Sequence, residues 1–396
     1  MGNAVVIVGA GLGGARVAEN LRLAGFSDPI TLVSRERHAP YDRPPLSKAV
    51  LRGDRDIVEL KPQGWYADND VTLLLDAEVV DADADAGTVT LASGTTLDFD
   101  TLVLATGLDA RYLPGTQQVR GVHVLRTQDD AVALREAAGP GVSAVVVGAG
   151  FIGCEVAASL QSLGTQVTIV EPAPTPLYAA LGPVIGSRVA QLHTSRGVGV
   201  RTGVGIERID VSDGAVTAVV LDNGTTLATD LVVVGIGSTP TTAVAEKLGL
   251  ELADASLAGG IACDTQGLTS RKHIYALGDV ANWARADGSR VRRVEHWNHV
   301  VEEAKVVADA IAGTDLAPSV LGVPYFWTDQ FDLKIQSLGD PSADDEVHIV
   351  DSDGDKFLAY FHRDGVLTGV VGGGRAGAVM KMRATVAARP PIADLL

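Results

Sequence analysis

Short apolar runs alternate with amphipathic helical stretches along the first part of the chain, and the same order recurs further on. Each series predicts a strand, a helix and a strand: 4–8, 13–24 and 30–34, then 144–148, 152–163 and 167–171. Buried strands that alternate with helices are typical of a parallel sheet covered on both faces. The pattern therefore predicts two α/β halves of similar plan.

Further apolar runs predict additional buried strands, at 102–107 and 231–237, which end in glycine, and at 274–281, which ends in Gly-Asp. Alternating positions predict antiparallel strands over 71–100 and β-structure over 200–227, and a helical pattern covers 296–312. The last part of the chain predicts a meander of short strands followed by a terminal helix: 324–328, 333–338, 346–350, 356–362, 366–371 and the helix 375–388. This part is typical of a small α+β domain.

One glycine fingerprint occurs twice, each time between a predicted strand and a predicted helix. The copies are Gly9-Ala10-Gly11-Leu12-Gly13-Gly14 and Gly148-Ala149-Gly150-Phe151-Ile152-Gly153. The first glycine makes the tight turn, the second lets the backbone approach a pyrophosphate, and the third lets helix and strand pack closely. The helix N-terminus then offers free N–H groups to the phosphates. Two copies predict two bound dinucleotides, most simply a flavin and a nicotinamide.

Acidic residues near the end of the second strand of each half bear on the choice of nucleotide. Glu171 stands where a carboxylate binds a ribose 2′-hydroxyl, and no Arg or Lys follows in 172–177 to accept a 2′-phosphate. The sequence therefore favours NADH over NADPH. The first half has Ser34 at the matching position and Glu36 two residues later, and we assign Glu36 to the flavin ribose. The neighbouring arginines, Arg35 and Arg37, are either solvated or in contact with phosphates.

These features together predict an α/β fold with two Rossmann-like dinucleotide-binding domains and a small α+β C-terminal domain. We expect a discontinuous FAD-binding domain over 1–108 and 239–317, an NAD-binding domain over 109–238, and the C-terminal domain over 318–396.

Charge and cysteine content narrow the function. The net charge of −17 argues against nonspecific nucleic-acid binding, which needs basic patches. The two cysteines, Cys154 and Cys263, form no close pair, so disulphide chemistry and a resident iron–sulfur cluster are both excluded. No metal site is expected. The apolar runs are strand-sized and the first of them belongs to the fold, so we expect a cytoplasmic protein without membrane contact.

Several stretches resemble the oxygenase-coupled NADH–ferredoxin reductases, the family of putidaredoxin reductase and of biphenyl-dioxygenase-type ferredoxin reductases. The most specific are Tyr41-Asp42-Arg43-Pro44-Pro45-Leu46-Ser47-Lys48 and Pro324-Tyr325-Phe326-Trp327-Thr328-Asp329-Gln330. Ala105-Thr106-Gly107 and Tyr275-Ala276-Leu277-Gly278-Asp279 match the family's flavin-binding turns, and 292–298 resembles its segment over the isoalloxazine. The resemblance covers essentially the whole chain and implies a glutathione-reductase-like architecture.

The resemblance also implies roles for individual residues. Lys48 would lie near flavin N5 and pair with Glu155, and Trp297 would stack beside the flavin and frame the nicotinamide site; these three are the expected catalytic residues. The expected FAD contacts are Gly9, Gly11, Gly14, Ser34, Glu36, Arg43, Lys48, Ala105, Thr106, Gly107, Arg126, Gly278, Asp279, Glu295 and Trp297. The expected NAD contacts are Gly148, Gly150, Phe151, Ile152, Gly153, Glu155, Glu171, Gly235, Ile236 and Gly237.

The activity implied is hydride transfer from NADH to FAD, followed by single-electron transfer to a small [2Fe–2S] ferredoxin that serves a cytochrome P450 or a ring-hydroxylating dioxygenase. Two basic groups are candidate ferredoxin docking patches: Arg285, Arg290, Arg292 and Arg293, or Arg375, Lys381, Arg383 and Arg389. Charge reversal at Arg290 or Lys381 is expected to slow ferredoxin reduction alone. The alternatives left open are a rubredoxin or monodehydroascorbate-type reductase, or an NADH-sensing flavoprotein resembling apoptosis-inducing factor. Either a monomer or a homodimer fits.

Overall fold

The computed structural model describes residues 3–62, 64–314 and 322–396. The chain divides into two compact units. Unit 1 consists of Met1–Asp42, Val58–Asp109 and Thr239–Gly322, and unit 2 of Arg43–Ile57, Ala110–Ser238 and Val323–Leu396. The chain passes from one unit to the other at the short strands β8 (Leu108–Ala110) and β17 (Ser238–Pro240), among other points.

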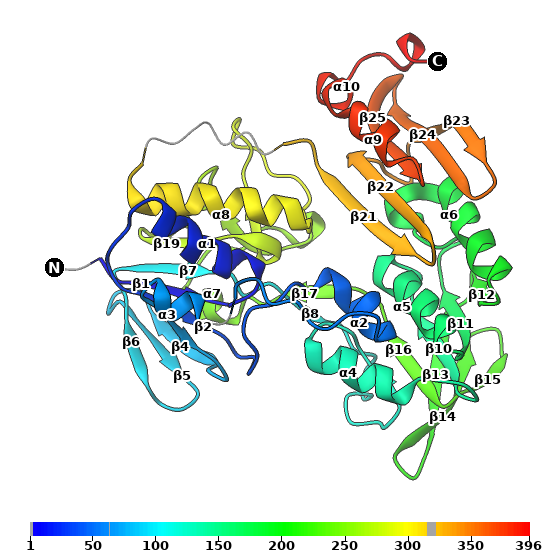
Figure 1. The fold of residues 1–396 in the computed structure, drawn as a ribbon, viewed down its shortest axis with the longest axis horizontal. Helices are drawn as coiled ribbons and strands as arrows, with labels where there is room; N and C mark the ends of the chain where they lie inside the picture. Colours follow the sequence, from blue (N-terminus) through cyan, green and yellow to red (C-terminus); the bar gives the residue numbers. More distant parts are fainter. Residues whose placement is uncertain (1–2, 63, 315–321) are drawn as a thin grey trace. The chain divides into compact units, whose positions relative to one another are not determined.

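Unit 1 is built on a five-stranded parallel sheet with the order β19-β7-β1-β2-β3. Its strands are β1 (Val5–Val8), β2 (Ile30–Val33), β3 (Val71–Leu74), β7 (Thr101–Leu104) and β19 (Ile274–Ala276). The helices α1 (Leu12–Leu23) and α8 (Trp297–Ala312) pack against each other over this sheet (Figure 1). Their apolar faces and the central strands form one core, because nearly every residue of β1 and β7 is apolar and buried.

Smaller elements complete unit 1. An antiparallel meander holds β4 (Val79–Asp83), β5 (Thr88–Leu91) and β6 (Thr96–Asp98), and a parallel pair holds β18 (Ile261–Cys263) and β20 (Ala281–Trp283). The short helices are α3 (Trp65–Asp68), α7 (Ala243–Lys247) and the 3-10 turns η2 (Ala255–Leu257) and η3 (Gly278–Val280).

Unit 2 repeats the parallel sheet with the order β12-β11-β10-β16-β9. The strands are β9 (Val122–His123), β10 (Ser143–Val147), β11 (Gln166–Glu171), β12 (Gly199–Thr202) and β16 (Leu231–Val234). Helices α4 (Gln128–Ala137), α5 (Phe151–Ser162) and α6 (Tyr178–Ser195) belong to it, with η1 (Pro44–Ser47) and α2 (Ala49–Arg52). A meander of β13 (Ile206–Ser212), β14 (Ala215–Leu221) and β15 (Thr226–Ala228) follows β12.

The end of the chain forms a five-stranded antiparallel sheet with the order β21-β22-β25-β24-β23. Its elements are β21 (Tyr325–Gln330), β22 (Leu333–Gly339), β23 (Glu346–Asp353), β24 (Lys356–Arg363), β25 (Val366–Gly373), α9 (Ala376–Lys381), α10 (Arg383–Ala388) and η4 (Ile392–Asp394). One face carries Ile335 and Phe361 into the same core as Leu160 of α5 and Ile185 of α6. This shared core joins the segment to unit 2.

The α/β fold with two Rossmann-like halves and a C-terminal α+β part is confirmed, but several predicted elements differ. Residues 71–74 are not part of an antiparallel meander; they add the parallel strand β3 beside β2. The predicted strand 274–281 stops at Ala276, because Gly278 has a φ of 72° and turns the chain into η3. The terminal helix is two helices, separated at Met382 with φ −82° and ψ −1°.

The predicted division into three domains stays a prediction. The two observed units place residues 43–57 and 323–396 together with the second nucleotide-binding half. The predicted boundary between 317 and 318 lies outside the described residues. Of the helices that the structure describes, none combines the length and the hydropathy needed to cross a membrane.

Candidate functional site

The first glycine fingerprint forms a tight turn between β1 and α1. Gly9 has a φ of 106°, and a Cβ there would lie 2.3 Å from the carbonyl oxygen of Ala105. A Cβ at Gly14 would lie 2.0 Å from the carbonyl oxygen of Gly9. Gly11 differs, because nothing lies within 4 Å of the place where its Cβ would stand. Close packing therefore requires glycine at positions 9 and 14, whereas Gly11 stands beside open space.

The second fingerprint repeats this geometry between β10 and α5. Gly148 has a φ of 97°, and its Cβ would lie 2.4 Å from the carbonyl oxygen of Gly235. A Cβ at Gly153 would lie 2.0 Å from the carbonyl oxygen of Gly148, whereas nothing lies within 4 Å at Gly150. The same backbone is built twice from different surrounding residues.

Both cradles fit the pyrophosphate of a dinucleotide. The helices α1 and α5 begin directly after Gly11 and Gly150, and no side chain caps either helix. Their first backbone N–H groups lack intrahelical partners, and the open space at the second glycine lets an anion approach them. Ile152 in the first turn of α5 is 47% exposed, and Phe151 contacts Phe326 of β21 with ring centroids 4.7 Å apart.

Glu171 ends β11 and closes the loop of the second cradle. Its Oε2 accepts the N–H of Ala149 at 2.7 Å, and its Oε1 accepts the N–H of Ala173 at 2.8 Å. These bonds hold the carboxylate at the carboxyl end of the strand, next to the glycine turn. Because each carboxylate oxygen has two lone pairs, both can still accept a ribose hydroxyl.

Ser34 and Glu36 follow β2 at the first cradle, and their side chains form different hydrogen bonds. Ser34 is buried, and its hydroxyl accepts the N–H of Glu36 at 3.1 Å. The Glu36 carboxylate accepts a hydrogen bond from the hydroxyl of Tyr41 at 2.6 Å. Glu36 is therefore the residue of the two that can bind ribose hydroxyls, while Ser34 shapes the turn. The neighbouring Arg35 forms an ion pair with Asp109.

The turns after β7 and β16 form the opposite walls of the cradles. Ala105, Thr106 and Gly107 follow β7, and the hydroxyl of Thr106 donates to the carbonyl of Thr241 at 2.7 Å. Gly235, Ile236 and Gly237 follow β16 in the same way. The last glycine of each turn has a positive φ, of 70° at Gly107 and 93° at Gly237.

The Gly278–Asp279 turn is held by two side chains that the sequence did not single out for this role. The N–H of Gly278 donates to Oε2 of Glu303 at 2.6 Å, and the guanidinium of Arg293 donates to the carbonyl of Asp279. Arg293 also pairs with Glu295 at 2.8 Å. Nothing in the sequence separates these residues from ordinary surface charges, and only their burial reveals the role.

Trp297 begins α8 and is anchored by a residue of the Tyr41–Lys48 stretch. Its indole N–H donates to Oδ1 of Asp42 at 3.0 Å. The predicted flavin residues thus fall into two sets. Arg43, Lys48 and Arg126 belong to unit 2, and the others belong to unit 1. Arg43 and Arg126 lie together, because the guanidinium of Arg43 donates to the carbonyl of Arg126 at 2.6 Å.

Lys48 and Glu155 form the ion pair that the resemblance implied. The ammonium lies 2.7 Å from Oε2 of Glu155, and the same oxygen accepts the hydroxyl of Ser47 at 2.5 Å. Oε1 accepts the hydroxyl of Thr328 at 2.6 Å and the N–H of Asp329 at 3.3 Å. Glu155 is only 2% exposed, so this carboxylate is buried and surrounded by donors. Thr328 belongs to the P-Y-F-W-T-D-Q stretch, which the sequence singled out without assigning it a partner.

Both cysteines are buried and unpaired, Cys154 in unit 2 and Cys263 in unit 1. Burial raises the pKa of each thiol above its ordinary value. A buried neutral thiol is a poor nucleophile.

The two basic groups differ in how many of their side chains are accessible. Arg293 is buried and Arg290 donates to the carbonyls of Cys263 and Asn282, so these two support the fold; Arg285 and Arg292 are exposed. In the C-terminal group Arg375 pairs with Asp351 at 2.6 Å, while Lys381 and Arg389 are exposed. The guanidinium of Arg293 is held by the carbonyls of Ala258 and Asp279, and ferredoxin docking on either basic group stays a prediction.

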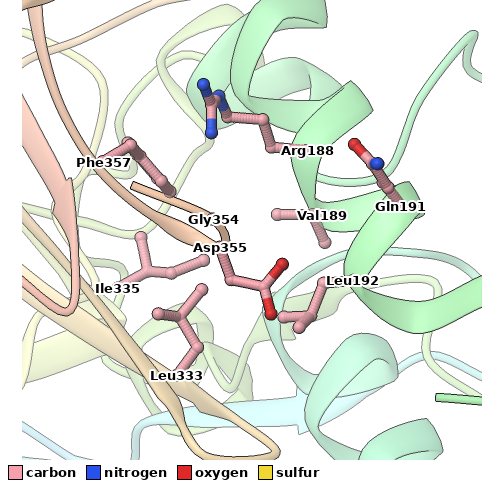
Figure 2. Close-up of a pocket in the computed structure, with 9 residues that line it drawn as sticks. All are labelled: Arg188, Val189, Gln191, Leu192, Leu333, Ile335, Gly354, Asp355 and Phe357. Atoms are coloured by element: carbon pink, nitrogen blue, oxygen red, sulfur yellow. The ribbon is translucent and has the colours of Figure 1, made fainter. Parts of the chain in front are cut away.

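A small pocket lies between α6 and the C-terminal sheet of unit 2 (Figure 2). Apolar side chains such as Leu192, Ile335 and Phe357 line it together with Arg188 and Asp355. Its volume of about 180 Å³ is below the roughly 300–1,000 Å³ typical of ligand sites, and no predicted site residue lines it. We assign no ligand to it.

The structure has two dinucleotide cradles on two parallel sheets, and its cysteines are not paired. These features define a pyridine-nucleotide-dependent flavoprotein oxidoreductase without a redox-active disulphide. The chain belongs to the pyridine nucleotide-disulphide oxidoreductase family, which matches residues 3–304, and residues 325–394 match the reductase C-terminal family. The family uses FAD and NAD(H), the cofactors predicted from the sequence.

Known proteins similar to this chain are reductases. The ferredoxin–NAD(+) reductase subunit of the benzene 1,2-dioxygenase system of Pseudomonas putida is 36% identical, over 86% of this chain and 81% of that protein. A rubredoxin–NAD(+) reductase of Pseudomonas putida is 35% identical, over 85% of this chain and 86% of that protein. The crystal structure of the covalent putidaredoxin reductase–putidaredoxin complex contains a chain with a TM-score of 0.91 and 31% identity, covering 98% of this chain and 94% of that chain.

Proposed function

We propose that this protein is an FAD-dependent NADH–ferredoxin reductase, which takes a hydride from NADH and passes single electrons to a small [2Fe–2S] ferredoxin. The ferredoxin would serve a cytochrome P450 or a ring-hydroxylating dioxygenase. The observation that carries the proposal is the pair of matched glycine cradles in a chain whose only two cysteines are single and buried. Similarity to the benzene dioxygenase reductase and to the putidaredoxin reductase chain supports a ferredoxin as the acceptor.

FAD, when bound, supplies hydride acceptance and one-electron release, and the protein supplies binding, orientation and electrostatics. The first cradle, Glu36 and Asp279 would hold FAD. The second cradle and Glu171 would hold NADH. In this assignment residues 1–108 with 239–317 form the FAD-binding domain, 109–238 the NAD-binding domain and 318–396 the C-terminal domain.

Lys48 would provide a fixed positive charge near the reacting part of the flavin, and Glu155 is the positioning residue that holds its ammonium. Such a preorganised charge stabilises negative charge that develops during reduction. Trp297 would frame the nicotinamide site, and its indole is already oriented by Asp42. No side chain has to act as a nucleophile.

The test is an anaerobic visible-spectrum titration of the purified protein with NADH and, in parallel, with NADPH. We expect bleaching of the flavin absorption at about one NADH per flavin and a sluggish response to NADPH. Purified ferredoxin added next should reoxidise the flavin. A colourless protein, or a bound flavin that NADH does not reduce, would overturn the proposal.

Glu171→Ala is expected to narrow the preference for NADH over NADPH by about tenfold to a hundredfold. The substitution removes the hydrogen bond that the ribose hydroxyl would donate to the charged carboxylate, worth about 1.5–3 kcal/mol, and also the repulsion of a 2′-phosphate. The ratio of kcat/KM for the two cofactors measures the change. Glu207→Ala, an exposed residue of β13 in the same unit, is the control. An unchanged ratio in Glu171→Ala would remove this residue from the ribose site.

Lys381→Glu is expected to slow ferredoxin reduction by about threefold to tenfold at low ionic strength, since acidic ferredoxins are steered by positive charge. Lys381 is exposed in α9, whereas Arg290 is held by backbone carbonyls and its reversal would disturb the fold. Stopped-flow rates with ferredoxin, against flavin reduction by NADH as the internal reference, measure the effect. Lys272→Glu makes the same charge change at an exposed residue of unit 1. Equal rates for both variants would exclude the C-terminal patch.

A rubredoxin reductase is the second candidate function, favoured by the 35% identical rubredoxin–NAD(+) reductase. Comparison of kcat/KM for purified ferredoxin and rubredoxin separates the two. Slow turnover with every acceptor, together with NADH-dependent dimerisation, would instead support the sensing flavoprotein.

A further inference from the structure

A buried carboxyl group lies directly beneath the Gly278–Asp279 turn. Glu303 projects from α8 and is 3% exposed. Its Oε2 accepts the N–H of Gly278 at 2.6 Å, and its Oε1 lies 3.3 Å from Nε2 of His299, one helical turn earlier. Within the described part of the chain, no lysine or arginine is paired with Glu303. The only basic group in contact with this carboxyl is an imidazole.

The surroundings of the pair favour a shared proton over two charges. Burial raises the pKa of Glu303 well above its ordinary value, against the opposing effect of the hydrogen bond from the N–H of Gly278, and the nearby Asp279 of η3 and Glu302 of α8 raise it further. Burial lowers the pKa of His299 to about 4. Cys263 of β18 also lies near Glu303, and its raised pKa keeps it neutral. A carboxylic acid that donates from Oε1 to Nε2 of the imidazole, and accepts from Gly278 at Oε2, gives both of its oxygens a partner.

The turn above the pair has little freedom to move. Gly278 has a φ of 72°, and a Cβ there would lie 3.5 Å from Val300 of α8. The guanidinium of Arg293 holds the carbonyl of Asp279. The bonds that hold this turn include the one from Arg293 to the carbonyl of Asp279 and the one from Gly278 to the titratable side chain of Glu303.

We propose that Glu303 and His299 are positioning residues for the flavin, a proton-sharing pair that holds the Gly278–Asp279 turn in its binding geometry and releases it when the shared proton is lost. This inference rests on the proposed contact of Asp279 with FAD. Loss of the proton leaves a buried carboxylate close to the carboxylate of Asp279, and water must enter to solvate it. The turn then shifts and binds flavin less tightly.

The direction of the pH dependence follows from the two pKa shifts. The pKa of Glu303 is raised in the folded protein. The stabilisation that its protonated form gives to the folded protein is therefore complete below the ordinary pKa near 4.5, and it is lost as the pH rises through the raised pKa. The folded pKa of His299 is lowered, so its contribution is complete above the ordinary 6.5 and is lost as the pH falls towards about 4. FAD retention is therefore expected to be best at intermediate pH and to fall on the alkaline side because of Glu303.

Glu303→Gln tests the proposal, because glutamine keeps an acceptor for Gly278 and a donor for His299 but does not titrate. Holoprotein is diluted at a series of pH values, and the fluorescence of released FAD gives its dissociation constant. Above the pKa of the pair, the wild-type dissociation constant is expected to rise by up to about tenfold per pH unit, while that of Glu303→Gln stays level. Glu251→Gln, at an exposed residue of unit 1 whose charge does not act on the pKa of Glu303, makes the same charge change and should retain the wild-type profile. Identical profiles for the wild type and Glu303→Gln would overturn the inference.

Two further measurements separate the possible failures. Calorimetry of FAD binding to wild-type apoprotein, in buffers of different ionisation enthalpy, should show proton uptake on the alkaline side, and no uptake would contradict the inference even if Glu303→Gln does not fold. Asp279→Asn should weaken FAD binding at every pH. If it does not, the proposed contact of Asp279 with FAD fails, and the inference that rests on it fails too.

Discussion

Glu155→Ala is expected to lower the free energy of unfolding by about 3–5 kcal/mol, the usual cost of breaking a buried ion pair by removing one partner. The carboxylate accepts hydrogen bonds from Ser47, Lys48, Thr328 and the backbone of Asp329, and its removal takes an acceptor away from each of these donors. Lys48 remains partly exposed and can turn towards water, which places the expected loss at the lower end of the range. Urea denaturation followed by circular dichroism measures it.

The pairing itself is tested by a double-mutant cycle. Lys48→Met leaves the Glu155 carboxylate without its cation, and Glu155→Leu leaves the ammonium without its anion. The double variant leaves neither charge unpaired, so its loss of stability should be smaller than the sum of the two single losses. Glu136→Gln, an exposed position on α4, should change stability by less than about 0.5 kcal/mol. If the loss of stability in the double variant equals the sum of the two single losses, Lys48 and Glu155 do not stabilise each other in solution.

The same pair also affects the proposed chemistry. Because Lys48 is held by Glu155 and by the carbonyl of Pro44 at 3.0 Å, its charge has a defined position. Lys48→Met should therefore slow anaerobic reduction of the flavin by NADH more than it weakens NADH binding. This separation of rate from affinity distinguishes a charge that acts on the reaction from one that only supports the fold.

The parts of the fold that the sequence predicted best are those determined by local rules. The glycine fingerprints require a strand, a tight turn and a helix in immediate succession, and both turns have the expected positive φ at Gly9 and Gly148. Strand β3 was placed wrongly, because only its pairing with β2, far away in the sequence, makes it parallel. Helix α6 was missed because it contains Gly182 and Pro183; Gly182 has φ 66° and ψ −179°, so two helical pieces meet there at a kink.

The candidate site divides in the same way. Residues within motifs, such as Glu171 and the cradle glycines, could be proposed as site residues from spacing alone. Arg293 and Glu303 could not, because charged residues in a loop or on a helix are usually solvated. Their roles depend on burial against the Gly278–Asp279 turn, which brings together residues from separate parts of the chain. The chemistry of such buried charges is decided by tertiary packing, and the sequence pattern around them is that of ordinary surface segments.

The second large effect is expected at the glycines of the second cradle. Alanine at Gly153 should lower stability, whereas alanine at Gly150 should lower only the affinity for NADH. A Cβ at Gly153 would lie 2.0 Å from the carbonyl oxygen of Gly148, and a backbone atom cannot turn aside as a side chain can. Gly153→Ala should therefore cost about 3 kcal/mol of stability or more, at the upper end of overpacking effects, and should abolish NADH binding. Gly150→Ala meets no protein atom within 4 Å at a φ of −72°, so its thermal stability should stay unchanged.

The affinity of Gly150→Ala for NADH decides whether the open space is the phosphate site. A methyl group there would keep the pyrophosphate from the first N–H groups of α5, at a cost of about 1.5–3 kcal/mol, or tenfold to a hundredfold in Kd. FAD content should not change, because the first cradle is untouched. Gly377→Ala, in the open on α9, is the matched control and should be neutral or stabilising by up to about 1 kcal/mol, because alanine is the better helix former. Helix propensity alone would stabilise Gly153→Ala as well. If Gly153→Ala loses stability while Gly377→Ala gains it, the difference is due to the steric clash at Gly153. Normal NADH affinity in Gly150→Ala would mean that the pyrophosphate binds elsewhere.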